Sequence, residues 1–585
     1  MPQKTKRTNA LAARPEPTAK DRPSTLVAEL CRQLLSLLRA RNIQAGYRIL
    51  DRADPALRSL CATDEGASDL LLLIAQWVDA GYRDQVFLDQ MLARFPLSIR
   101  SQLKVGAYLR VHMVEAFRAL ATNNADSAIG ILDIVLRLDG DLLDSELKTI
   151  AHLWKGRAHR KKADYHGALE HLTAARDLAI MLPDSDALCA VIKIQQAWVL
   201  FQQGDTKIAL TLLQQAEDAL RHTDHAIAKG NIESARGRII RRQGDYTGAL
   251  QCFDRAIALY QTGHPDHPNL ARTLTNAAFV KRLLALQLQK SIDSGSQRTS
   301  SVASGKPDRG ARDPHLRELR RLHQELYRGA IAQLERAKQI SVLHAQHNVL
   351  GSALVNAGHL HLDIGDVELA ASEAEQAYLL GTKTQSSLLM ARARILQALT
   401  ENSHVNEWLG DSRNAPQHAM NAKRFCIEAL ELARHTENKR LMMGAYLAQG
   451  EVACNDFFHD WPLARQSADL ASELLVPSDA DHAVEELTAL KSKVLRAVGI
   501  DDTLRAWSEG VVVGKTFKEV TEEFAQLVIP RIWAREDRKI SRVARKLSMS
   551  PQKVRRLLKR SGLGEADLNE PDKGSISRSA TPHQR

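Results

Sequence analysis

Cysteine, aromatic side chains and long apolar runs are scarce in this chain of 585 residues, of which 5% are Phe, Trp or Tyr. The cysteines form no CxxC pair, which argues against a disulfide framework or a zinc ribbon. We expect them to be small buried residues in a reducing cytoplasm. No apolar run approaches the roughly 18–20 residues of a membrane span. The first residues lack the apolar segment of a secretory signal. The sequence therefore predicts a cytoplasmic protein without a membrane partner. The six cysteines are at positions 31, 61, 189, 252, 426 and 454.

Motifs for catalysis and cofactor binding are also absent. The sequence contains no GxxxxGK[ST], no GxGxxG after a strand, no HExxH and no GxSxG. Three close histidine pairs, at 222/225, 264/267 and 359/361, have no Cys or carboxylate at ligand spacing, so packing or surface roles fit them better than metal binding. We predict no enzyme activity, no catalytic residue, no metal and no cofactor.

The charge of the chain is concentrated near its C-terminal end. The net charge is +11, and residues 531–560 alone hold twelve Lys or Arg against two Asp or Glu, a net charge of +10. Diffuse charge favours solubility, whereas a dense cluster is typical of proteins that bind a polyanion. Elsewhere Ala, Leu and Arg abound and β-branched runs are few, which favours an all-α fold.

One motif recurs through the middle of the chain. A small residue precedes a turn ending in Asp, and an Ala-Leu-x-x-Leu/Phe-x-x-Ala run follows. We predict that the small residue lets a second helix approach closely. The Gly-Asp turn should end one helix and cap the next, and the apolar face should be buried by stacking on neighbours. The leading small residues are at 156, 197, 237 and 278, in steps of 41, 40 and 41, with another copy at 358. The third copy reads Gly237, Gly244-Asp245-Tyr246, Ala249-Leu250-x-x-Phe253-x-x-Ala256.

These residues resemble the tetratricopeptide repeat (TPR) family, whose usual period is 34 residues. The resemblance covers roughly 140–475 well and 26–140 loosely. It implies an α-solenoid with a concave groove that binds a protein or peptide. One copy is interrupted by residues 291–314, rich in Ser, Gly and Arg, which we expect to form a disordered loop. A basic tether or a phosphorylation site remains an alternative for this insertion.

The C-terminal region predicts three short helices. Thr516 and Glu519 have the spacing of a capping box. Pro530 should kink or end the helix that follows. A second helix is expected at about 540–547 and a third from Pro551 to about Arg560, with Ser550 as N-cap. Ala544 should be small so that the last two helices can cross. The small core should comprise Ile540, Val543, Leu547, Met549, Val554 and Leu558.

The polar residues of the last two helices should then face outward. Gln552, Lys553 and Arg556 lie in the early turns that meet base edges in helix-turn-helix proteins. The positions better suited to phosphates are Arg542, Arg545, Lys546, Lys559 and Arg560. Arg555 completes the predicted DNA-binding set.

Residues 515–563 resemble the Fis-type helix-turn-helix, at Val543-Ala544, Leu547, Met549-Ser550, Val554-Arg555-Arg556, Leu558-Lys559 and Gly562-Leu563. Family members bind DNA as dimers, which implies a dimer surface at 516–534. Ser548 departs from the resemblance because glycine is usual at that turn position, and Pro530 departs from it within the preceding helix.

The fold class predicted is therefore all-α, a TPR-like α-solenoid followed by a three-helix Fis-type module. The function predicted is a transcriptional regulator that binds double-stranded DNA through the module and a protein or peptide through the solenoid. The alternative is a non-enzymatic interaction scaffold whose basic end docks on an acidic partner. The predicted boundaries are a disordered tail 1–24, a divergent helical region 25–140, a solenoid 141–500, a linker 501–515, the module 516–563 and a disordered tail 564–585.

Overall fold

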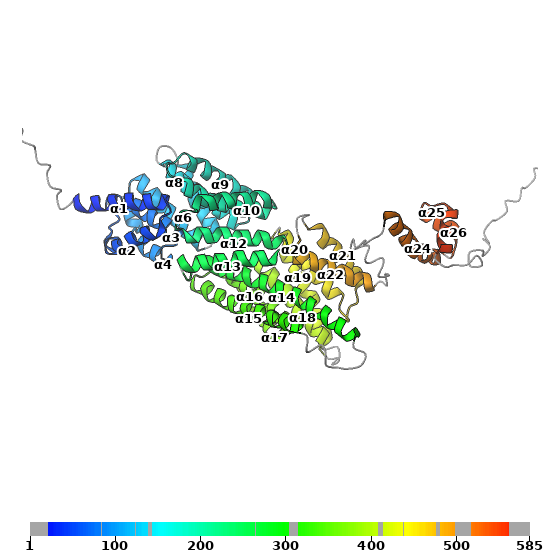
Figure 1. Ribbon diagram of the computed structural model, residues 1–585. Coiled ribbons are helices and arrows are strands. Elements are labelled where there is room, and N and C mark those ends of the chain that lie inside the picture. The colour runs from blue at the N-terminus through cyan, green and yellow to red at the C-terminus, as the bar shows by residue number, and fades with distance from the viewer. Residues whose placement is uncertain are drawn as a thin grey trace, which may run out of the picture. The chain divides into compact units, whose positions relative to one another are not determined.

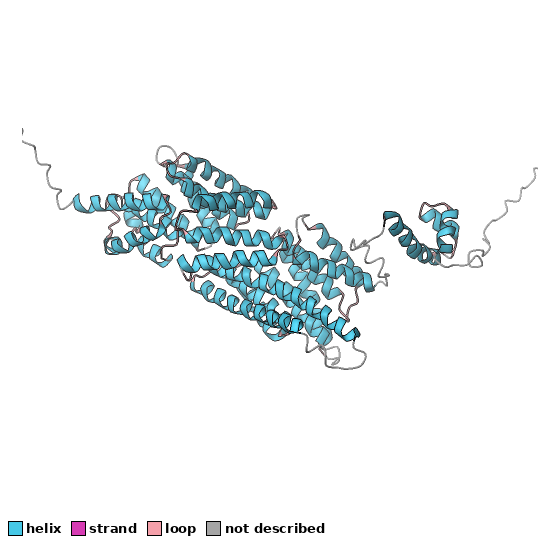
Figure 2. Cartoon of the chain, in the orientation of Figure 1, coloured by secondary structure: helices cyan, strands magenta, loops and turns pink. Residues whose placement is uncertain are grey.

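The computed structural model describes residues 21–83, 85–122, 124–138, 143–263, 265–302, 314–407, 414–436, 438–475, 480–497, 516–536 and 538–560. Within these residues it contains helices and no strand (Figure 2). The chain divides into two compact units, Met1–Leu487 and Thr488–Arg585. We refer to them as unit 1 and unit 2.

Unit 1 is a series of antiparallel helical hairpins (Figure 1). From α6 to α21 each even-numbered helix packs on the odd-numbered helix that follows it. The helices are α1 (Asp21–Arg39), α2 (Ile43–Ser59), α3 (Ala67–Asp79), α4 (Gln85–Leu92), α5 (Leu97–Arg100), α6 (Val105–Ala121), α7 (Ala125–Arg137), α8 (Ser145–Lys161), α9 (Tyr165–Ile180), α10 (Asp186–Gln203), α11 (Thr206–Leu220), α12 (Ala226–Arg242), α13 (Tyr246–Gly263), α14 (Pro268–Val302), α15 (Pro314–Leu343), α16 (His347–Asp363), α17 (Val367–Lys383), α18 (Ser387–Glu407), α19 (Ala415–Arg434), α20 (Lys439–Ala453) and α21 (Trp461–Glu473). The next helix, α22 (His482–Ala497), crosses the boundary between the units.

The recurrent motif forms the hairpins as its residue types predict. In the third copy, Ala249, Phe253 and Ala256 on α13 are fully buried. A Cβ built on Gly237 of α12 would lie 2.8 Å from the ring of Phe253, so the small residue is what permits this contact. Gly244 adopts φ +86°, a left-handed conformation that glycine adopts without strain. The Asp245 carboxylate accepts from the backbone N–H of Gly248 at 2.8 Å, which caps α13.

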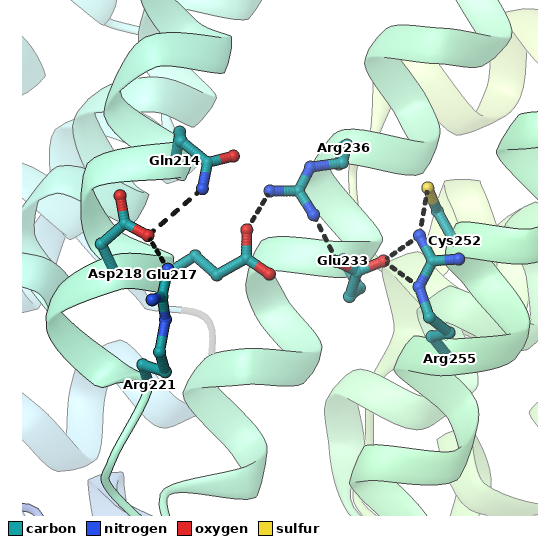
Figure 3. Close-up of polar contacts among 8 residues, drawn as sticks. All are labelled: Gln214, Glu217, Asp218, Arg221, Glu233, Arg236, Cys252 and Arg255. Carbon is teal, nitrogen blue, oxygen red and sulfur yellow. Dashed lines mark hydrogen bonds and ion pairs between the residues drawn. The ribbon is translucent and has the colours of Figure 1, made fainter.

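Ion pairs connect successive hairpins in addition to the apolar contacts. Arg236 of α12 pairs with Glu217 of α11 at 2.7 Å and with Glu233 of its own helix at 2.5 Å. Glu233 is buried and also accepts from Arg255 of α13, whose Nη2 lies 2.7 Å away (Figure 3). Because Glu233 serves two guanidiniums, its buried charge is compensated.

Three predictions for unit 1 are wrong. The predicted tail 1–24 is too long, since α1 begins at Asp21. The boundary at 140 is not a domain boundary, because one core cluster contains residues from both sides of it. Phe117 and Trp154, for example, have ring centroids 4.9 Å apart. The predicted end of the solenoid at 500 lies close to the end of α22 at Ala497, and the division between the units falls within that helix.

The insertion 291–314 is the third. Helix α14 continues through residues 291–302, so this part is not a loop. The Ser291 and Ser294 hydroxyls donate to carbonyls one turn earlier, at 3.2 and 2.8 Å. Lys290 pairs with Glu485 at 2.7 Å just before this stretch. Residues 303–313 lie outside the described residues, and Pro314 begins α15.

The cysteines are free, and most are buried as expected. Cys189, Cys252, Cys426 and Cys454 are buried and Cys31 is half-buried, whereas Cys61 is exposed in the turn after α2. The expectation of burial is therefore wrong for Cys61, because the turn leaves its side chain outside the core.

The described residues of unit 2 contain the end of α22 and three further helices, α24 (Phe517–Arg535), α25 (Ile540–Lys546) and α26 (Pro551–Arg560). The predicted linker 501–515, Gly562 and Leu563 of the resemblance, and the tail 564–585 lie outside the described residues. Of the two predicted effects of Pro530, an end to the helix is wrong, because α24 continues to Arg535. Ile529 and Trp533 on either side of it are buried in the core of unit 2, and this packing offsets the hydrogen bond that proline cannot make.

Candidate functional site

The basic surface of unit 2 rests on a small apolar core. Val543 and Ala544 of α25 pack with Val554, Leu557 and Leu558 of α26, and Ile529 and Trp533 of α24 complete the cluster. Ile540, Leu547 and Met549 are partly buried against it. The sequence reasoning placed most of these residues correctly but missed Leu557 and Ile529. Leu557 lies one position from the expected core residue Leu558, where helical spacing alone allows either.

The turn between α25 and α26 fixes the orientation of the second helix. Ser548 adopts φ +53°, so a non-glycine residue occupies a left-handed position there. The Met549 N–H donates to the Ala544 carbonyl at 2.9 Å and closes the turn. The Ser550 hydroxyl accepts from the Lys553 N–H at 3.2 Å, as expected for an N-cap, and Pro551 occupies the first turn of α26.

All nine candidate residues are exposed, three on α25 and six on α26. On α26 the buried positions are 554, 557 and 558, so its polar residues occupy the remaining arc of the helix. We call this set the basic face; its members are Arg542, Arg545, Lys546, Gln552, Lys553, Arg555, Arg556, Lys559 and Arg560.

Only part of the basic face is neutralised by nearby acids. Lys546 pairs with Glu536 at 2.5 Å, and Arg560 pairs with Glu522 of α24 at 3.2 Å. Within the described residues, the side chains of Arg545, Lys553, Arg555 and Arg556 have no carboxylate partner. These four side chains can therefore contact an external anion without breaking an ion pair.

The predicted dimer surface at 516–534 is only partly available. Trp533 is 5% exposed because it belongs to the core of unit 2, so its side chain is not available for a dimer contact. Phe524 on the same helix is 48% exposed. Thr516 and Glu519 form the expected capping box, in which the Thr516 N–H donates to Glu519 at 2.7 Å.

Unit 1 contains a recess where the resemblance implied a groove. Its volume is about 340 Å³, and its walls come mainly from α8, α10, α12 and α14, the first helices of successive hairpins. The second helices of the hairpins contribute few residues to the walls; Tyr260 of α13 is one of them. This arrangement agrees with a solenoid in which one helix of each repeat lines the inner surface.

In the described ranges, no cluster of three or more His, Cys, Asp or Glu side chains could hold a metal ion. In the same part of the chain, no helix combines the length and apolarity needed to cross a membrane.

Comparisons with known proteins bear on unit 1. Residues 229–295 match the Tetratricopeptide repeat family model. No curated protein matches the chain. Similar solved structures include the apo form of RapI (12% identity, TM-score 0.39, covering 77% of this chain and 97% of that one). Another is a Rap protein complexed with Competence and Sporulation Factor, with 11% identity and a TM-score of 0.41; the match covers 77% of this chain and 100% of that one. A third is the apo form of the quorum sensor NprR from B. thuringiensis, with 12% identity and a TM-score of 0.43; the match covers 70% of this chain and 97% of that one.

Likenesses at this level do not indicate what the present chain binds. The family match covers α12, α13 and most of α14, where the recurrent motif and its buried glycine contact are found. The chain is a TPR-like helical repeat protein.

Proposed function

We propose that this protein is a DNA-binding regulator that acts by binding rather than by catalysis. Unit 2 binds double-stranded DNA through a Fis-type helix-turn-helix, with α26 entering the major groove. Unit 1 receives a protein or peptide partner. The observation that carries the proposal is the basic face, an exposed array of cations held on a compact core with four members unpaired.

We assign base contacts to the first turns of α26 and phosphate contacts to positions on both helices. On α26, Gln552, Lys553 and Arg556 lie in the first turns, from which side chains reach base edges in helix-turn-helix proteins. Arg545 at the end of α25 and Lys559 near the end of α26 suit phosphates. Backbone phosphates supply most of the affinity, and base edges supply sequence preference.

The test is a gel shift with the full-length chain and mixed-sequence duplex DNA at low salt. The double variant Arg555→Ala/Arg556→Ala should lose at least tenfold in affinity, because each lost ionic hydrogen bond is worth roughly 1.5–3 kcal/mol. Arg320→Ala/Arg328→Ala removes the same charge from exposed positions on α15 and should bind like the parent chain. Equal affinity of both double variants would remove the DNA proposal.

The scaffold alternative makes a different prediction for the same material. If the basic face docks on an acidic protein, the partner should be retained after nuclease treatment, and no duplex DNA should bind at low salt. Loss of the partner in Arg555→Ala/Arg556→Ala together with absence of DNA binding would favour the scaffold.

A further inference from the structure

The recess of unit 1 is lined by cations far in excess of acids. Its walls contain six arginines and one lysine, and Asp79 is their single carboxylate. Asp79 pairs with Arg157 at 2.6 Å, and Arg83 pairs outside the recess with Asp54 at 2.9 Å. Within the described chain, five of the seven cations have no carboxylate partner: Arg41, Arg160, Lys161, Arg238 and Arg272.

Several polar atoms in the walls are buried without a hydrogen-bond partner. They include Nε of Arg41, Arg160 and Arg238 and both ring nitrogens of His225. Arg41 is only 9% exposed and His225 only 4%. A buried polar group left unpaired costs roughly 1–3 kcal/mol, so such groups in one place call for an explanation. An acceptor-rich ligand in the recess would satisfy the three guanidinium Nε atoms and the one ring nitrogen of His225 that carries a proton.

Some cations of low exposure elsewhere in unit 1 have carboxylate partners, as Arg282 has Asp363 at 2.5 Å and Lys338 has Glu373 at 2.5 Å. Arg241 of α12, outside the recess, is also buried with its Nε unpaired, but the recess gathers several such cations in one place. The recess cations also repel one another. Desolvation, followed by the charges of Arg272, Arg157 and Arg238, lowers the pKa of Arg160 to about 9, which still leaves it charged at neutral pH.

We propose that the recess of unit 1 binds a compact phosphate-rich anion, a ligand carrying a diphosphate or triphosphate group. A guanidinium forms paired hydrogen bonds with phosphate oxygens, and several arginines suit several phosphates. Phosphates linked in a chain place several negative charges within a few ångströms. Side chains on one face of an extended peptide recur only at about 6–7 Å, so a peptide delivers charge less densely. A volume of about 340 Å³ is that of a small-molecule site.

The walls also contain groups for the rest of such a ligand. Arg160 lies over the Trp198 ring, 4.9 Å from its centroid, and Trp198 Nε1 is buried and unpaired. Gln195 Oε1 is buried and unpaired one turn away on α10. A ring donor and an amide acceptor beside the cations could accommodate a nucleobase, so a nucleotide and inorganic triphosphate are the two sources to separate. This site goes beyond the proposed function, because DNA binding by unit 2 does not require it.

The test is calorimetry and thermal unfolding of the full-length chain with inorganic triphosphate, ATP and an oligoglutamate peptide. Triphosphate should bind and raise the unfolding midpoint. Arg238→Gln and Arg272→Gln should each weaken binding by roughly tenfold or more, while the exposed variant Arg328→Gln on α15 should not. If ATP binds more tightly than triphosphate, the ligand is a nucleotide. If the two bind equally, the polyphosphate group alone is recognised. Both results support the site.

Two further readouts separate the recess from the basic face and from misfolding. Arg238→Gln should raise the unfolding midpoint of the ligand-free chain, because it removes a repelling charge, and should reduce the midpoint shift caused by triphosphate. Arg555→Ala/Arg556→Ala should leave triphosphate binding unchanged. The proposal is overturned if triphosphate does not bind, if it binds both recess variants as it binds the parent, if affinity is lost in the unit 2 variant instead, or if oligoglutamate binds more tightly.

Discussion

Arg282 of α14 and Asp363 of α16 form a two-pronged ion pair, with Nε–Oδ2 at 2.5 Å and Nη2–Oδ1 at 3.0 Å. Their side chains are 11% and 12% exposed, and the Tyr327 hydroxyl of α15 lies 3.5 Å from the same carboxylate. Three helices therefore meet at one buried charge pair. A pair of this kind stabilises a fold weakly overall, but removing one member strands the other.

Arg282→Ala should accordingly lower the free energy of unfolding by about 3–5 kcal/mol. Arg282→Met/Asp363→Leu should lose much less, because no buried charge remains. Arg321→Ala, which breaks an exposed pair with Glu318 on α15, should change it by less than about 1 kcal/mol. Chemical denaturation of the full-length chain measures all three. A single variant no less stable than the double variant would contradict this view of the pair.

Gly237→Ala should destabilise unit 1 by about 1–3 kcal/mol, because the added Cβ meets the buried ring of Phe253 and forces it to shift. Gly130→Ala is the matched control. Gly130 is exposed within α7, with open space where its Cβ would lie, so alanine should add up to about 1 kcal/mol of helix stability. The thermal unfolding midpoints of the two variants should shift in opposite directions from that of the parent chain. Equal shifts would show that the glycine contact is not tight.

Ser548→Gly should stabilise unit 2 by about 0.5–1 kcal/mol. Serine at φ +53° bears a steric cost that glycine lacks, and glycine's greater freedom in the unfolded chain offsets part of the gain. Ser541→Gly, at an exposed position in α25, should have the opposite effect. Hydrogen exchange of amides in α25 and α26 reports on unit 2 separately from unit 1. Slower exchange in Ser541→Gly than in Ser548→Gly would contradict the assignment of strain.

The buried imidazole of His225 makes the stability of unit 1 depend on pH. Desolvation, with the charges of Arg41, His267 and Lys229, lowers its pKa well below the ordinary value of about 6.5. Below that pH the unfolded chain binds a proton that the folded chain does not. The contribution of His225 is therefore complete above about pH 7 and is lost as pH falls, by at most about 1.4 kcal/mol per pH unit.

His225→Gln should flatten this decline between pH 7 and pH 5 in denaturation measurements. His222→Gln removes an exposed histidine from the same turn and should leave the decline as it is. A decline identical in both variants would assign the pH dependence to other groups.

DNA affinity should fall linearly with salt on logarithmic axes, because each neutralised phosphate releases counterions. Arg545→Ala should reduce the slope by about 0.9, the share of one phosphate contact. Gln552→Ala removes no charge, so it should preserve the slope and relax base preference at one position. Titration of duplex DNA by fluorescence anisotropy at several salt concentrations distinguishes the two. A slope unaffected by Arg545→Ala would remove that residue from the phosphate contacts.

Local sequence signals identified much of this architecture. Ser550-Pro551 located the start of α26, and Gly237 with Phe253 located a hairpin contact, because caps and close approaches depend on neighbouring or periodic residues. Pro530 did not end its helix, because buried side chains on both sides of it outweigh one missing backbone hydrogen bond. The recess could not be predicted, because its cations range from position 41 to 272 and are brought together by the stacking of several hairpins.

The continuous core from Val27 to Val199 determines how unit 1 can be divided in the laboratory and in evolution. A cut at position 140 would expose the apolar faces that α6 and α8 share, leaving two fragments with a tendency to aggregate. Repeats can be gained or lost at the end of a stack at little cost in stability. The first hairpins here share one core, so losing one of them would expose the apolar faces of its neighbours. Variation in repeat number among related chains should therefore be concentrated beyond α10.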